Sequence, residues 1–196
     1  MERTIIPLCA VSAVVAAMAP HAVNAQSSRA TPQPPAPSRP QPQVVAESDL
    51  AKLPSRVAEM RGRILDAAKS GDIEKLRIAL ERNETPPAIV RGGKGDLVEQ
   101  LRGKSFDRDG RDVMARLVNL LDAPYAHINP GKPQEMYVWP AFAEMMWEQL
   151  GPSDWVSLYR VVPANVIKES LERRRYLGDR IGLGADGTWH YFLTGE

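Results

Sequence analysis

The chain has 196 residues, of which 25 are basic and 24 acidic, and its formal net charge is +1. With 43% hydrophobic and 25% charged residues, the composition is typical of a globular protein. The balanced charge argues against a nucleic-acid partner, and no apolar run reaches the roughly 20 residues that span a bilayer.

The first 25 residues have the pattern of a secretory signal peptide. A weakly positive start, 1–4, precedes an apolar run over 5–19. The small residues of Ala22-Val23-Asn24-Ala25 predict cleavage after Ala25. The only cysteine, Cys9, would leave with this segment. We therefore expect a periplasmic or secreted protein without disulfides, thiol chemistry or a zinc–thiolate site, and with no membrane span after cleavage.

A proline-rich segment follows the predicted signal peptide. Residues 26–43 contain six prolines and no large apolar side chain. Such a segment cannot bury enough surface to offset the entropy of ordering, so we predict a disordered spacer over 26–45. One globular domain then occupies 46–196. All twelve aromatic residues lie between Phe106 and Phe192, which predicts an aliphatic helical annex over 46–105 and an aromatic core over 106–196.

Two helices are predicted near the start of the domain. One begins at Pro54-Ser55, and Asp72 is placed to cap the second. Between them, the Ala67-Ala68 pair and the Gly71-Asp72 junction make residues 65–80 resemble the helix pair of an ankyrin repeat. No second copy is found, and repeats need neighbours to bury their faces. We therefore predict a local helical hairpin.

The acidic stretch before the next helix has two interpretations. Asp107-Arg108-Asp109-Gly110 resembles part of a calcium loop, but Arg116 stands where an EF-hand requires glutamate. Asp side chains also favour the start of a helix, here one beginning near Arg111. We prefer helix initiation and predict no metal and no cofactor.

Residues 123–140 carry the strongest indication of a site. Four prolines and a glycine preclude a helix, and Asn129-Pro130-Gly131 predicts a turn between two short extended pieces, 125–128 and 136–139. This segment either forms the wall of a groove or is a packed connector. The candidate ligand-binding residues on the groove interpretation, together with one from the C-terminal strand, are Tyr125, His127, Glu135, Tyr137, Trp139 and His190.

Three further helices and a hairpin are predicted after Pro140. The helices begin at Pro140, at Ser153 or Asp154, and at Pro163. The third ends near Arg173-Arg174-Arg175, which either bind an anion or complement the helix dipole. Asp186-Gly187 between apolar runs predicts a β-hairpin. The expected fold is mainly α (α+β), with about six helices and a C-terminal β-hairpin packed on the aromatic-rich core.

The motifs Gln134–Pro140 (QEMYVWP) and the terminal GLGADGTWHYF hairpin resemble a family of uncharacterised exported bacterial proteins, of proteobacterial type. The resemblance covers 125–196 and implies export, with no indication of chemistry.

Two functions remain open, a non-catalytic binding module and, as the alternative, an envelope hydrolase acting on peptidoglycan or glycan. In the hydrolase, His127, Glu135 and Glu144 would carry the chemistry. The sequence contains no motif that pairs a nucleophile with its base. We therefore predict no catalytic residues and prefer a non-catalytic binding module whose partner is an envelope protein or a cell-wall ligand.

Overall fold

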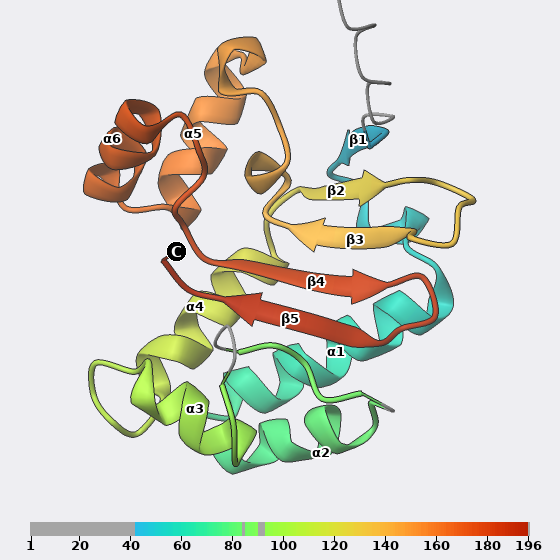
Figure 1. Ribbon diagram of the computed structural model, residues 1–196, viewed down its shortest axis with the longest axis vertical. Coiled ribbons are helices and arrows are strands. Elements are labelled where there is room, and N and C mark those ends of the chain that lie inside the picture. Colours follow the sequence, from blue (N-terminus) through green and yellow to red (C-terminus); the bar gives the residue numbers. More distant parts are fainter. Residues whose placement is uncertain (1–41, 84, 90–92, 196) are drawn as a thin grey trace, which may run out of the picture. The chain divides into compact units, whose positions relative to one another are not determined.

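The computed structural model describes residues 42–83, 85–89 and 93–195. The predicted signal peptide and most of the predicted spacer lie outside these residues. The described part is an α+β fold with six α-helices and a five-stranded sheet (Figure 1).

The sheet is entirely antiparallel, with its strands in the order β1-β2-β3-β4-β5. Its strands are β1 Val44–Glu47, β2 Tyr125–Ile128, β3 Met136–Trp139, β4 Arg180–Gly184 and β5 Trp189–Leu193. His127 pairs with Tyr137, and Tyr137 pairs with Leu183. The two predicted extended pieces are therefore central strands, and the predicted C-terminal hairpin is one part of a larger sheet.

One face of the sheet is covered by the first four helices (Figure 1). These are α1 Ser55–Lys69, α2 Leu76–Glu81, α3 Leu97–Gly103 and α4 Arg111–Leu121. Asp72 caps the turn into α2 by accepting from the Glu74 amide at 3.1 Å, and Gly71 takes a left-handed φ of 74°. Aliphatic side chains of these helices and aromatic side chains of the sheet share one core. The region predicted as an annex thus supplies half of the main core.

The opposite face packs on smaller residues. Ala126 and Val138 lie there with Ala141, Met145 and Tyr191 around them. The last two helices, α5 Pro152–Val161 and α6 Ala164–Arg173, form a separate cluster with Phe142 and Trp147. They lie beside the end of the sheet at which β4 begins (Figure 1).

The structure corrects several local predictions. The helix expected from Pro140 is absent: residues 141–143 and 147–149 form two short 3-10 turns. The Trp147 indole donates to the Phe142 carbonyl at 2.8 Å, which occupies the acceptor that a continuing helix would use for the amide of residue 146. Strand β1 begins at Val44, where the spacer was expected to extend to residue 45. Helix α3 was not predicted.

Candidate functional site

Three of the predicted site residues, His127, Glu135 and Tyr137, meet at the carboxylate of Glu135. His127 Nε2 lies 2.6 Å from Glu135 Oε1, and the Tyr137 hydroxyl donates to the same oxygen at 3.1 Å. The Gly131 amide donates to Oε2 at 3.1 Å, and the imidazole stacks on the Tyr137 ring with centroids 4.4 Å apart. The turn between β2 and β3, with Asn129 and Gly131 at positive φ, brings these groups together.

The hydrogen bonds of this cluster stabilise the ionised carboxylate. The bond with His127, followed by those from Gly131 and Tyr137, lowers the pKa of Glu135. Burial, reinforced by Glu135, raises the pKa of Tyr137 to about 12. The Glu135 carboxylate therefore already has three hydrogen-bond partners within the protein: His127, Tyr137 and the Gly131 amide.

The remaining candidates do not complete a binding surface. Tyr125 and Trp139, like Tyr137, point into the main core and are almost fully buried, so they offer no free contact area. The Tyr125 hydroxyl donates to the Asp49 carbonyl at 3.3 Å. His190 is exposed on β5 and does not face His127, because two strands separate them. His190 is therefore separated from His127, and the aromatic candidates of β2 and β3 belong to the main core.

A cavity lies elsewhere in the fold. It has a volume of about 870 Å³, is open to solvent, and lies between the turn region 143–148 and the end of α6 with the chain leading into β4. Its lining from the second of these regions consists of Ser170, Leu171, Arg174, Arg175, Tyr176 and Arg180. The volume falls within the roughly 300–1,000 Å³ that small-molecule sites occupy.

The cavity wall combines apolar and charged groups. Met145, Met146, Trp147 and Leu171 are its apolar part, and Met146 and Leu171 are 64% and 51% exposed. Arg174, Arg175 and Arg180 contribute three guanidinium groups, and no described carboxylate forms an ion pair with any of them. Nearby Arg173, in contrast, pairs with Glu169 at 2.8 Å.

Glu144 is the acidic group set most deeply in this wall. Burial raises its pKa, against a smaller opposing effect of Arg180. Its charge also acts on Tyr191, whose pKa burial raises to about 12. Tyr191 belongs to the sheet face opposite His127 and Tyr137. Glu144 is therefore on the other side of the sheet from the His127–Glu135 pair.

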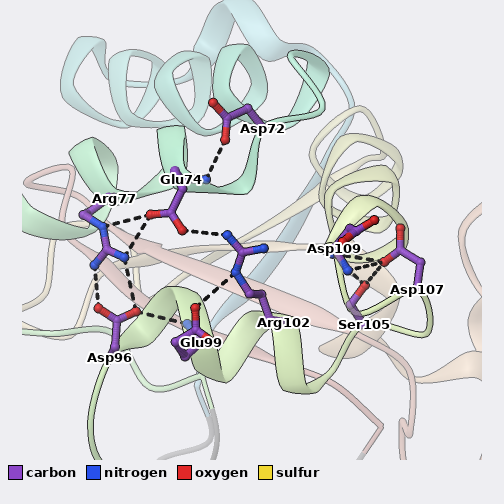
Figure 2. Close-up of polar contacts among 10 residues, drawn as sticks. Asp72, Glu74, Arg77, Asp96, Glu99, Arg102, Ser105, Asp107 and Asp109 are labelled. Carbon is purple, nitrogen blue, oxygen red and sulfur yellow. Dashed lines mark hydrogen bonds and ion pairs between the residues drawn. The ribbon is translucent and has the colours of Figure 1, made fainter.

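A second polar cluster joins α2 and α3 (Figure 2). Arg77 bridges Asp96 at 2.5 Å and Glu74 at 3.0 Å, and Arg102 bridges Glu74 at 2.6 Å and Glu99 at 3.1 Å. Each guanidinium already has carboxylate partners. This network therefore stabilises the contact between two helices and offers no free charge to a ligand.

The predicted acidic loop starts α4, as the helix-initiation interpretation requires. Figure 2 shows Ser105 beside Asp107, whose carboxylate accepts from the Gly110 amide at 3.0 Å and from the Arg111 amide at 3.2 Å. Asp112 accepts from the Phe106 amide at 2.9 Å. The described residues contain no group of three or more His, Cys, Asp or Glu positioned to hold a metal.

Comparisons with family models, with curated proteins and with solved structures find no match to this chain. In the described part of the chain, no helix is both long and apolar enough to cross a membrane. The resemblance of 125–196 to exported bacterial proteins stays a prediction.

Sequence reasoning missed most of the cavity because its two walls are about thirty residues apart. The run Arg173-Arg174-Arg175 was the one signal available, and it allowed an anion as one of two interpretations. Met146 lies in the segment after Pro140, where a helix was expected and does not form.

Proposed function

We propose that the protein is an exported, non-catalytic binding module of the cell envelope, and that its ligand occupies the cavity between residues 143–148 and the end of α6. The observation that carries the proposal is the composition of this wall. Guanidinium groups that form no ion pair with a described carboxylate line one concavity of ligand size together with exposed apolar side chains.

Comparison with the sequence-predicted groove supports this location. The aromatic side chains of 125–139 are buried in the core. The polar groups of His127 and Tyr137 are hydrogen-bonded to Glu135. A binding surface needs accessible anchors. The cavity has them in Met146 and Leu171.

The hydrolase alternative loses support from the same geometry. It requires His127, Glu135 and Glu144 to act on one substrate, but Glu144 lies in the cavity, beyond the sheet from the other two. A pair of catalytic carboxylates must flank one scissile bond. We therefore propose binding and not hydrolysis.

The test is capture of envelope components by the immobilised protein, with bound molecules identified by mass spectrometry. The double variant Met146→Asp/Leu171→Asp places two charges in the apolar part of the cavity lining. Both side chains are exposed, so the substitutions should change the stability of the fold little. The matched control is Val156→Asp with Tyr159→Asp, two residues of α5 that are similarly exposed but do not line the cavity. Melting temperatures of both variants are measured first.

We expect the cavity variant to lose a ligand that the wild type and the α5 control both retain. Equal retention by both variants would refute the cavity as the binding site. Loss in the α5 control alone would place the binding surface on α5. Turnover of peptidoglycan or a generic ester, abolished by His127→Gln, would move the protein to the enzyme class.

A further inference from the structure

The chemistry of the cavity wall points to the class of ligand, an inference that rests on the binding function proposed above. We propose that the cavity binds an amphiphilic anion: its acidic head pairs with Arg180, its apolar chain lies along Met145, Met146 and Leu171, and Glu144 competes for the same guanidinium.

The case for an acidic head depends chiefly on Arg180. Arg174 and Arg175 follow the last turn of α6, where cations are expected for a simpler reason, since they complement the helix dipole. That reason does not apply to Arg180, which begins strand β4. Arg180 is only partly exposed and has no ion pair with a described carboxylate. A partly buried guanidinium in this situation is suited to a carboxylate, phosphate or sulfonate from outside.

The case for an apolar chain depends on side chains from both walls, Met145 and Met146 from one and Leu171 of α6 from the other. Met145, Met146 and Leu171 are unbranched or γ-branched side chains, and methionine adapts readily to the shape of a bound chain. Met146 and Leu171 expose more than half of their surface, which a bound alkyl group would cover. An inorganic anion would leave these side chains uncovered, so the ligand should carry both parts.

Glu144 makes the affinity depend on pH. When ionised, it repels an incoming anion and attracts Arg180; when protonated, it does neither. Its pKa is raised by burial, so this change occurs above the ordinary range of a glutamate. Asp179, close by, is held by Arg116 at 2.7 Å, and burial raises its pKa as well. The other charged or titratable groups facing this region are Glu148, Arg174, Arg175, Tyr176 and Tyr191.

Isothermal titration calorimetry with octanesulfonate tests the proposal, because a sulfonate keeps its charge from pH 5 to pH 8. The comparison probes are 1-octanol, which lacks the acidic head, and methanesulfonate, which lacks the chain. We expect octanesulfonate to bind at least tenfold more tightly than either. Arg180→Met should weaken octanesulfonate at least tenfold, whereas Arg160→Met, a change outside the cavity on α5, should leave its affinity unchanged.

The pH series tests the role of Glu144. Affinity of the wild type for octanesulfonate should rise as pH falls from 8 to 5. Glu144→Gln should bind more tightly at pH 8 and lose most of this dependence, while Asp179→Asn should retain it. Loss of the dependence in Asp179→Asn alone would overturn the assignment to Glu144.

Two further outcomes separate this inference from the proposed function. If octanol binds as tightly as octanesulfonate and Met146→Asp/Leu171→Asp abolishes both, the cavity is a binding site but recognition of an acidic head is refuted. If no probe binds in a way that this double variant affects, the ligand class is refuted, and the envelope capture decides the binding function separately. Octanoate and N-acetyl-leucyl-leucine, compared at pH 7, then distinguish a fatty-acid source from a peptide C terminus.

Discussion

Truncation of Trp189 to alanine should be among the most destabilising single changes in this protein. The side chain is fully buried in the core shared by the sheet and the first four helices. Its indole donates to the Tyr191 carbonyl at 3.0 Å. The Asn83 side chain accepts from the Trp189 amide and donates to the Trp189 carbonyl, both at 3.0 Å. Removing the ring leaves a large cavity where β5 meets the segment after α2.

Loss of a buried aromatic side chain lowers the free energy of unfolding by about 3–5 kcal/mol. At roughly 2–4 °C for each kcal/mol in a domain of this size, the melting temperature should fall by about 6–20 °C. Urea unfolding followed by circular dichroism measures the first quantity and a thermal scan the second.

Phe106→Ala is the matched control, because Phe106 is 94% exposed and its removal should change stability by less than about 0.5 kcal/mol. A loss below about 1 kcal/mol for Trp189→Ala would refute the placement of β5 in the core.

Three further predictions concern the backbone and two carboxylates. Gly110→Ala should destabilise more than Gly71→Ala in urea unfolding. Both sites have positive φ, but of the two only Gly110 would bring the new Cβ against a neighbour, the Ile73 side chain, and equal losses would refute this. Glu135→Gln should destabilise at pH 7, and the difference should shrink below about pH 4 because a lowered folded-state pKa adds stability only while the group is ionised. Glu144→Gln should stabilise the folded protein at pH 8. This gain should shrink as pH falls toward about 4, because burial raises the pKa of Glu144 and ionisation of this group therefore opposes folding. A gain that grows at low pH would contradict the burial of an ionised Glu144.

The elements that depend on local chemistry were predictable from the sequence. The spacing of apolar residues predicted α1, and the capping Asp72 predicted the turn after it. The aspartates before Arg111 predicted the start of α4. Asp186-Gly187 likewise predicted the C-terminal hairpin. In each of these cases the signal and the structure lie within a few residues of one another.

The sheet was only partly predictable because its pairing is non-local. Strand β1 pairs with β2 about eighty residues later, and β3 pairs with β4 across two intervening helices. Strand β5 also departs from the alternation of a regular strand, since an irregularity opposite Gly182 and Leu183 leaves His190 as an extra residue. Trp189 and Phe192 consequently share the core face, and His190 is exposed.

The candidate site, like the sheet, was only partly predictable from the sequence. The sequence placed His127, Glu135 and Tyr137 among six candidate residues, and the structure joins these three by hydrogen bonds to Glu135. It could not show that three aromatic candidates would be buried beneath helices whose packing depends on the whole fold. It also could not bring residues 143–148 to the end of α6, because that contact follows from the arrangement of α5 and α6.

The most direct test of the proposed binding site is an NMR titration of the isotope-labelled protein with octanesulfonate. The account predicts that amide shifts change in residues 143–148 and 170–180, and that the amides of 125–139 stay unperturbed. Shifts concentrated in 125–139, with the cavity residues unchanged at saturating ligand, would contradict it.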